Sequence, residues 1–336
     1  MHQGLKRDYV LAVCGLSKHQ FYYQPTGGKP GRRLSSHTLR LFEGQGVSMS
    51  NRSVVAEMRS ILTDPRVDYG YRKMCGQLTL MGYYINHKKV YRLMKGARLL
   101  QPKAEKGTKN YVKYRIVCPE GPLRLMEMDI KMVWLEGLRR YGYILTILDV
   151  FTRVVLQWDL GLQMRQQDVE RSWTRLIEQH LQAHAVLGWE THIEIQSDNG
   201  PQFCAQKLQQ FFKDNYLIQS FTHPYTPQEN GHIESFHAIL SKKNLKGKEF
   251  DDLSELRKEL QGFYPFYNYQ RIHTSILNIP PMTFWKLWNQ QHIQRILLDQ
   301  KSRKVKFKLN IPRQQVTLVQ PSENESLRLL SAHTAI

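Results

Sequence analysis

The chain has 336 residues and a formal net charge of +19, from 48 Lys and Arg against 29 Asp and Glu. Its hydrophobic content of 41% excludes a disordered or fibrous protein and suffices for a full-sized core in at least one domain. No apolar run approaches the ~18 residues of a membrane span, and no charged-then-apolar leader opens the chain. We therefore expect a cytoplasmic protein with no membrane partner. The four cysteines and 13 histidines show neither a C-x-x-C pair nor zinc-type spacing.

The positive charge is concentrated near the N-terminus. Residues 1–115 hold 22 Lys and Arg against 6 Asp and Glu, whereas residues 116–336 hold 26 against 23. A strongly basic segment indicates a polyanionic partner, although charge alone does not separate DNA, RNA and anionic lipid.

Residues 1–24 have the pattern of a helix-turn-helix segment. Residues 5–13 predict a short helix, Cys14-Gly15-Leu16 a turn, and Ser17 the N-cap of a second helix that presents Lys18 and His19 to DNA. Residues 25–47, rich in Gly, Pro and Ser, have the composition of a linker.

Residues 48–105 predict a second helix-turn-helix-like DNA-binding domain. One helix starts at Asn51, a second covers residues 71–81 and breaks at Gly82, and a third begins after Asn86 and ends at Gly96. The third helix would carry an outward row of polar side chains, His87, Lys88, Lys89 and Arg92. Such a row is either a solvated face or a recognition helix, and its basic surroundings favour the latter. Residues 106–122 resemble a second linker in composition.

Residues 123–285 change to an α/β pattern. Three apolar stretches with short connections (125–133, 143–150 and 153–158) predict an antiparallel meander, and helices and strands then alternate. Helices are expected at 167–180, 202–214, 231–243 and 253–267, and strands at 192–196 and 218–221. The pattern predicts a mixed sheet covered by helices. Residues 286–336 read as a small basic β tail, in which Lys304, Lys306 and Lys308 alternate with apolar residues.

Three carboxylates in this α/β region share one possible explanation. Asp129 lies inside an apolar strand, where a lone charge is costly unless it is paired or bound to a metal. Asp198 closes a strand at a turn, and Glu234 lies on a helix behind a Pro-containing loop. Each alone has an ordinary explanation, as a turn residue or a solvated helix residue. If the two strands are neighbours, the three side chains can share a pocket suited to Mg²⁺ or Mn²⁺.

These residues and their flanking strings resemble a known family. Asp198 and Glu234 are separated by 35 residues, and they lie in the strings SDNGPQF (197–203) and PYTPQENGHIESFH (224–237). With Asp129, they are similar to the retroviral-integrase-like DDE transposases, in particular the second-frame (OrfB) product of the insertion sequence three family. The strings YGYR (69–72), YN (267–268) and RIHTS (271–275) are similar to the same family. The resemblance covers roughly residues 5–285.

The resemblance implies an RNase H-like catalytic core at 123–285 and a DNA transposase. Two Mg²⁺ (or Mn²⁺) ions held by Asp129, Asp198 and Glu234 would support cleavage and joining of DNA strands at the ends of an insertion sequence, by in-line displacement at phosphorus. The expected partners are double-stranded DNA, both terminal repeats and target, further copies of the chain in a dimer or larger homo-oligomer on that DNA, and an upstream-frame helix-turn-helix segment. Further DNA contacts are expected from Arg72, Asn230, Lys242, Lys243, Arg271 and His273.

Two departures from the family pattern leave alternatives open. The family usually has Lys or Arg seven positions after the Glu, where this chain has Ser241 followed by Lys242, which is rotated about 100° along a helix. Ile130-Lys131 follows Asp129 where the family usually has Ile/Val-Thr, and Asp149, in LDVFTR (148–153), is the alternative first carboxylate.

Two other functional classes remain as alternatives to the transposase. One is a DNA-binding protein without catalysis, which the presence of all three carboxylates disfavours. The other is a simple RNase H-type hydrolase, which would not explain two basic helical modules ahead of the core. Retroviral integrase itself is disfavoured because no His-His-Cys-Cys zinc module precedes the core.

Overall fold

The structure, a computed structural model, describes residues 4, 6–24, 34–102, 118–188, 190–223, 227–299 and 304–321. Large parts of both expected linkers (25–33 and 106–117), residues 224–226 of the Pro-containing loop and the chain from residue 322 lie outside the described residues. The chain divides into two compact units, 1–36 and 37–336.

The first unit is a short helical hairpin. Its helices are α1 (Arg7–Val13) and α2 (Lys18–Phe21), and Gly15, with φ of +64°, lies in the turn between them. Ser17 caps α2 as predicted, because its hydroxyl accepts the Gln20 N–H at 3.2 Å. Leu11 is the one buried side chain among the described residues of this unit, so the hairpin has little core of its own.

Residues 37–50 form a β-hairpin, although the sequence indicated a linker up to residue 47. Strands β1 (His37–Phe42) and β2 (Gln45–Ser50) pair antiparallel through a turn at Glu43 and Gly44, both with positive φ, as a two-residue hairpin turn requires. Most side chains of both strands face solvent, so the sequence lacks the alternation that signals a half-buried strand. The linker expected at residues 25–47 is therefore wrong for residues 37–47, which belong to this hairpin.

The three predicted helices of the second segment are present. They are α3 (Asn51–Ile61), α4 (Tyr71–Leu80) and α5 (His87–Gly96), and the side chain of Asn86 caps α5 by accepting the Lys89 N–H at 2.9 Å. After α4 the chain turns at Gly82, which has φ of +90° and lies against β1. A Cβ at Gly82 would lie 2.3 Å from the carbonyl oxygen of Leu41, so only glycine fits there.

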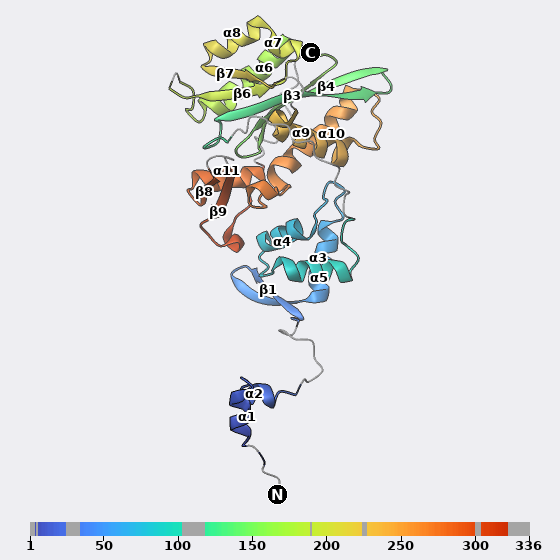
Figure 1. Ribbon diagram of the computed structural model, residues 1–336. Coiled ribbons are helices and arrows are strands. Elements are labelled where there is room, and N and C mark those ends of the chain that lie inside the picture. Colours follow the sequence, from blue (N-terminus) through green and yellow to red (C-terminus); the bar gives the residue numbers. More distant parts are fainter. Residues whose placement is uncertain are drawn as a thin grey trace. The chain divides into compact units, whose positions relative to one another are not determined.

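Five strands form the central sheet in the order β5-β4-β3-β6-β7 (Figure 1). They are β3 (Leu125–Leu135), β4 (Arg140–Asp149), β5 (Val155–Gly161), β6 (Ile193–Ser197) and β7 (Leu217–Phe221). The first three form the predicted antiparallel meander, whereas β6 lies parallel to β3 and β7 parallel to β6. This topology confirms the mixed RNase H-like α/β sheet.

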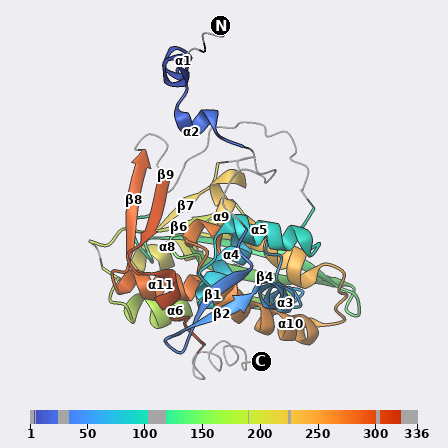
Figure 2. The same cartoon turned by 90° about the horizontal axis from the view of Figure 1, so that it is seen from below.

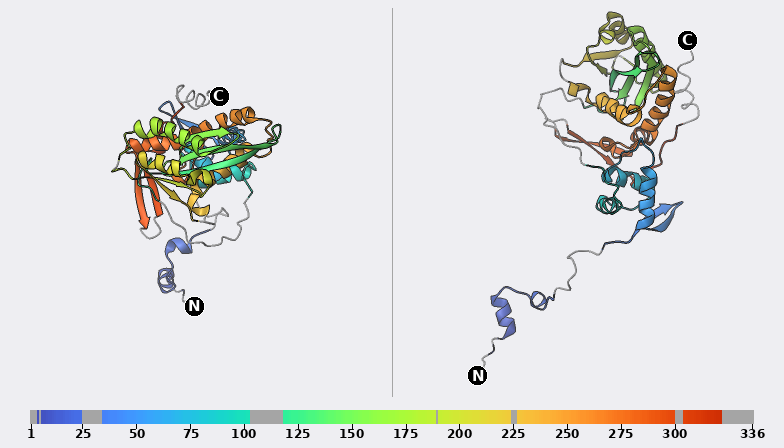
Figure 3. Two further views of the ribbon diagram at one scale, coloured as in Figure 1. Left: turned by 90° about the horizontal axis from the view of Figure 1, so that it is seen from above. Right: turned by 90° about the vertical axis from the view of Figure 1, so that its right-hand side faces the viewer.

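Helices cover both faces of the sheet (Figure 3). On one face lie α6 (Gln166–Leu176), α7 (Pro201–Cys204) and α8 (Gln206–Asp214), and on the other α9 (Gly231–Leu240) and α10 (Leu253–Pro265). The single helix expected at 202–214 is two helices, because Ala205 is extended. Helices α6, α9 and α10 continue into wider π-helical turns at Ile177–Gln182, Ser241–Leu245 and Phe266–Gln270.

The C-terminal part begins with α11 (Pro281–Asn289) and a hairpin of β8 (Ile293–Asp299) and β9 (Lys304–Leu309) (Figure 2). The alternating lysines thus lie on a strand that pairs with residues earlier in the chain. This part and the α3–α5 module share one apolar core, in which Phe284, Ile293 and Val316 join Val54 and Met58. No helix within the described ranges has the length and apolar character needed to cross a bilayer.

Candidate active site

Asp129 and Asp198 occupy neighbouring positions at one end of the sheet. In the parallel pairing of β3 with β6, Glu127 is the partner of Gln196, and the two aspartates follow two residues later on each strand. Asp129 is half-buried, and Asp198 is exposed just beyond the end of β6, where its Oδ1 accepts the Gly200 N–H at 3.0 Å. The two strands are thus neighbours, which is the condition under which the sequence predicted that these two carboxylates lie close together.

Glu234 reaches the same place from α9. It is exposed in the first turn of this helix, and one turn later His237 Nδ1 donates to Asp129 Oδ2 at 3.1 Å. The other oxygen of Asp129, Oδ1, accepts the Ile130 N–H at 2.8 Å. Helix α9 thus lies directly over the part of β3 that carries Asp129.

The carboxylates influence one another electrostatically. Although both residues are exposed, nearby protein partly desolvates the carboxyl groups of Asp198 and Glu234. This desolvation, and then the negative charge of Asp129, raise the pKa of Asp198. Desolvation, followed by the charges of Asp129 and Glu127, raises the pKa of Glu234. Like charges near one another disfavour ionisation, and a cation placed among them would relieve that repulsion.

The donor set fits a hard divalent cation. All three side chains offer carboxylate oxygens, the ligands that Mg²⁺ and Mn²⁺ prefer. Their mutual repulsion gives such an ion a further electrostatic reason to bind. Within the described ranges, however, no three His, Cys, Asp or Glu side chains already have the arrangement of a metal site. The structure thus brings the donors together without a finished coordination cage.

Asp149, the alternative first carboxylate, has a different environment. Its side chain is fully buried, Oδ1 accepts the Leu123 N–H at 2.9 Å, and Oδ2 accepts the N–H and hydroxyl of Thr152. Burial raises the pKa of Asp149. These contacts make Asp149 an anchor of the turn after β4, so Asp129 is the better candidate.

A groove that is lined in part by three lysines lies next to the acidic residues. It has a volume of about 510 Å³ and is lined by Lys131, Met132, Val133, Ala238, Ser241, Lys242, Leu245 and Lys246. Lys131 lies two residues after Asp129 on β3, and Ala238 one turn after Glu234 on α9. The groove therefore continues from the carboxylates along β3 and the helix. Lys242 is exposed and also lines a second hollow with Lys248 and Lys258.

Lys243 and Asn230, both expected to bind DNA, are largely shielded from solvent. Lys243 Nζ lies 3.6 Å from Asp68 Oδ2, in the loop before α4. Asn230, at the N-cap of α9, is only 5% exposed, and its side-chain oxygen has no hydrogen-bond partner among the described residues. Neither side chain is presented to solvent like Lys242.

Helix α5 presents part of the expected basic face. His87 and Lys88 are exposed, as are Tyr91 and Lys95. Lys89 is half-buried and donates through Nζ to the carbonyl oxygen of His37 at 2.6 Å, so it also fastens β1 to the helix. Arg92 is half-buried too.

Arg271, also expected to contact DNA, is buried, and His273 is partly buried. Arg271 is 2% exposed, and its guanidinium donates to Asp68 Oδ1 and to the Arg66 carbonyl, both at 3.3 Å. Burial and then Arg271 hold the pKa of His273 well below its ordinary value. The two residues join the end of the core to the loop before α4, where Tyr69 OH also accepts the Ile272 N–H at 3.2 Å. A sequence pattern shows charge, whereas this burial depends on tertiary packing.

The remaining basic candidates are exposed. Arg72 lies over the ring of Tyr71 at 5.8 Å. In the first unit His19 is exposed, and Lys18 Nζ lies 3.0 Å from Asp8 Oδ2.

Sequence reasoning missed three side chains that surround the carboxylates. Glu127 is 1% exposed and bonds to the start of α9, Gln196 is 3% exposed and bonds to Glu229, and His237 bonds to Asp129. The sequence signal that could have identified Glu127 and Gln196 is their distance along the chain from the two aspartates. Glu127 and Gln196 each precede a candidate aspartate by two residues, and side chains two apart on a strand share a face.

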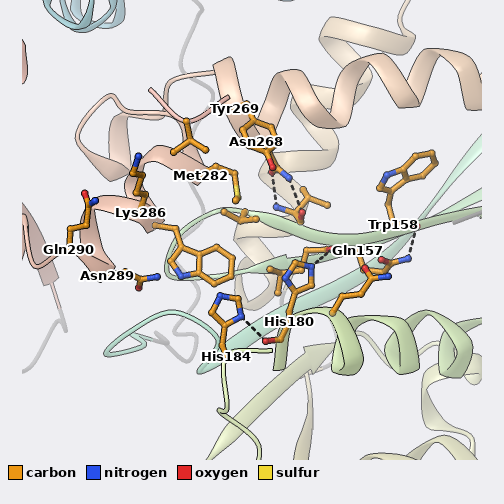
Figure 4. Close-up of a pocket in the computed structure, with 16 residues that line it drawn as sticks. Gln157, Trp158, His180, His184, Asn268, Tyr269, Met282, Lys286, Asn289 and Gln290 are labelled. Atoms are coloured by element: carbon orange, nitrogen blue, oxygen red, sulfur yellow. Dashed lines mark hydrogen bonds between the residues drawn. The ribbon is translucent and has the colours of Figure 1, made fainter. Parts of the chain in front are cut away.

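A separate pocket of about 460 Å³ lies beside the edge strand β5 (Figure 4). The side-chain amide of Asn268 donates to the Val155 carbonyl and accepts the Val155 N–H, both at 2.9 Å, and thus covers part of the strand edge. His184 stacks on Trp285 at 5.1 Å on the other side of the pocket. None of the three candidate carboxylates lines it.

The sequence matches three known families of domains. Residues 119–227 and 217–281 each match an integrase core domain, and residues 50–106 match an HTH-like domain. The chain is 26% identical over 255 residues to InsK of insertion sequence element IS150 from Escherichia coli, a protein named as a transposase; the match covers 72% of this chain and 85% of InsK. It is 27% identical to a 39.2 kDa protein of insertion element IS476 from Xanthomonas euvesicatoria, over 84% of this chain and 73% of that protein.

Solved structures show lower similarity. The catalytic core of the integrase of HTLV-2, in complex with magnesium, is 15% identical over 48% of this chain and 94% of that one, with a TM-score of 0.32. The catalytic domain of the Mos1 mariner transposase is 13% identical over 49% of this chain and 74% of that one, with a TM-score of 0.35.

Proposed function

We propose that this chain is a DNA transposase acting on the ends of an insertion sequence, because residues 119–227 and 217–281 match integrase core domains and an HTH-like match precedes them. Its reaction would be metal-dependent cleavage of DNA strands and their transfer to new DNA. The observation that supports the proposal is the strand register that places Asp129 next to Asp198, with both Asp198 and Glu234 close enough to feel the charge of Asp129. A groove that three lysines help to line lies alongside.

Asp129, Asp198 and Glu234 would hold two Mg²⁺ or Mn²⁺ ions. Bound there, such ions lower the pKa of an attacking water or 3′-hydroxyl and offset the charge that develops on the leaving oxygen. The protein's own share is to keep the three carboxylates in place. His237 fixes Oδ2 of Asp129, and the Gly200 N–H fixes Oδ1 of Asp198. No protein nucleophile is needed for this reaction.

The lysine-lined groove would hold the phosphates next to the scissile bond. Lys131, Lys242 and Lys246 line it together, and a polyanion lying in it would pass directly to the carboxylates. Ser241 occupies the usual basic position and lines this groove, and Lys242 and Lys246 line it as well. These two lysines could therefore supply the positive charge that Ser241 lacks.

The HTH-like domain would bind the terminal repeats of the element. The exposed side chains of α5, His87 and Lys88 among them, could meet phosphates or base edges in the major groove. Joining two DNA ends requires both to be held at once, so we include in the proposal a homo-oligomer on DNA in the bacterial cytoplasm and an upstream-frame partner segment. The mutual arrangement of the carboxylates disfavours a purely DNA-binding role.

An experiment with Asp198→Asn tests the proposal. The wild-type chain should join labelled duplexes that carry the element's terminal repeats to a plasmid in the presence of Mg²⁺, and Asp198→Asn should bind the same duplexes without joining them. The matched control is Asp214→Asn at the end of α8, which should join like the wild type. Loss of repeat binding together with joining in Asp198→Asn would count against the assignment.

A further inference from the structure

Two buried side chains on adjacent strands form hydrogen bonds with the segment that leads to Glu234. Glu127 on β3 and Gln196 on β6 are direct partners in the parallel register, and both are almost fully buried. Two residues further along the chain lie Asp129, on β3, and Asp198, just beyond the end of β6. Asp129 and Asp198 are therefore the candidate metal ligands, and Glu127 and Gln196, two residues before them, contact the segment that leads to Glu234.

Glu127 acts as a cap for α9 from outside the helix. Its Oε2 accepts the N–H groups of His232 at 3.0 Å and Ile233 at 2.7 Å, and its Oε1 lies 2.7 Å from His232 Nδ1. The first backbone N–H groups of a helix have no partner within the helix, so an external carboxylate both satisfies and fixes them. Glu234 is the next residue after Ile233.

Gln196 holds the turn that precedes the helix. Its Nε2 donates to the carbonyl oxygen of Glu229 at 2.9 Å, and the carboxylate of Glu229 in turn accepts the His223 N–H at 2.9 Å. Together with the His237 to Asp129 bond, these contacts fasten α9 to the sheet both before and after Glu234.

We propose that Glu127 and Gln196 are positioning residues that set where Glu234 stands relative to Asp129 and Asp198. The inference rests on the proposed function for the role of Glu234. Neither side chain needs to touch metal or DNA, because each acts through the backbone of residues 229–233. Removing a residue that orients a metal ligand without binding the metal itself typically lowers metal affinity by about 10- to 100-fold.

The test compares Glu127→Ala with Asp149→Ala in the full-length chain. Asp149 is a matched control because it is also a buried carboxylate that accepts two backbone N–H groups and one side chain, but on a different turn. Glu127→Gln is the rescue variant, because one amide oxygen can still accept both N–H groups of α9. Where Asp149→Ala does not fold, Asp149→Asn replaces it.

Two readouts are measured: Mn²⁺ affinity by electron paramagnetic resonance and amide hydrogen exchange of residues 229–236. Glu127→Ala should bind Mn²⁺ at least about tenfold more weakly and exchange these amides at least about tenfold faster. Glu127→Gln should stay within about threefold of the wild type, Gln196→Ala should lie between the two, and Asp149→Ala should change neither readout.

Equal Mn²⁺ affinity and equal exchange in Glu127→Ala and Asp149→Ala would overturn the inference. A wild type that binds no Mn²⁺ would contradict the proposed function instead. In that case the exchange readout alone decides whether Glu127 fixes the start of α9.

Discussion

The acidic site and the basic face of α5 are organised in different ways. Around the carboxylates, side chains are held by neighbours: Asp129 by His237, and the start of α9 by Glu127. On α5, His87 and Lys88 project into solvent. Chemistry at one phosphorus requires fixed geometry, whereas attraction to a DNA backbone depends mainly on charge. Substitutions in the first region should therefore alter the reaction, and those in the second mainly affinity.

The largest expected effect separates the two candidates for the first carboxylate. Asp129→Asn should lower strand joining by about a thousandfold, roughly 4 kcal/mol of transition-state stabilisation, because it removes a charged ligand. Asp149→Asn should keep measurable joining, since Asp149 anchors a turn. Initial rates with Mg²⁺ provide the comparison. Loss of joining in Asp149→Asn alone would reverse the assignment.

A second prediction concerns Arg271, which the sequence placed among the DNA contacts. Arg271→Ala should lower the free energy of unfolding by about 2 kcal/mol, because it removes a buried guanidinium and its hydrogen bonds to Asp68 and the Arg66 carbonyl, while Lys243 still pairs with Asp68. The affinity of the folded protein for DNA should change little. Chemical denaturation and a DNA-binding titration measure the two quantities. A variant of wild-type stability with weakened DNA binding would restore the original expectation.

A third prediction tests the basic face of α5. Lys88→Ala should weaken DNA binding by roughly threefold to tenfold and reduce the slope of log affinity against log salt by about 0.9, the value for one lost phosphate contact. Lys207→Ala on α8 removes the same charge from another exposed helix and is the control. Equal slopes for the two variants would argue against α5 as the DNA-contacting helix.

The smallest expected effect is a pH-dependent change in stability without metal. Because the pKa of Asp198 is raised in the folded protein, the folded state holds this proton more tightly, and the resulting stability is lost as pH rises through the raised pKa. Asp198→Asn should therefore melt about 1 to 3 °C above the wild type at pH 7.5. The difference should vanish below about pH 4, where Asp198 is protonated in both states. An Asp198→Asn variant less stable than the wild type at pH 7.5 would contradict the claim that the negative charge of Asp198 is unfavourable in the folded protein.

Much of the site was predictable, because it follows from strand order and spacing. Asp129 and Asp198 meet since one lies in the first strand and the other ends the fourth, and the mixed sheet places those strands side by side. Helix caps such as Ser17 and Asn86 were also readable, because capping depends on local residues.

The rest depended on tertiary contacts that no local pattern encodes. Arg271 looks like any other cation in the sequence, and only packing against Asp68 buries it. The β1–β2 hairpin has few inward side chains to reveal it. Glu127 acquires its role only when α9 returns to β3 over a hundred residues later.

The most direct test of the central claim is metal-dependent nicking of terminal-repeat DNA. End-labelled duplexes are incubated with Mg²⁺ and either the wild-type chain or Glu234→Gln, after binding of both proteins to the duplex has been shown to be equal. The account predicts strand cleavage at the repeat ends by the wild type, its loss on chelation of Mg²⁺, and its loss in Glu234→Gln. Cleavage by Glu234→Gln at the wild-type rate would contradict it.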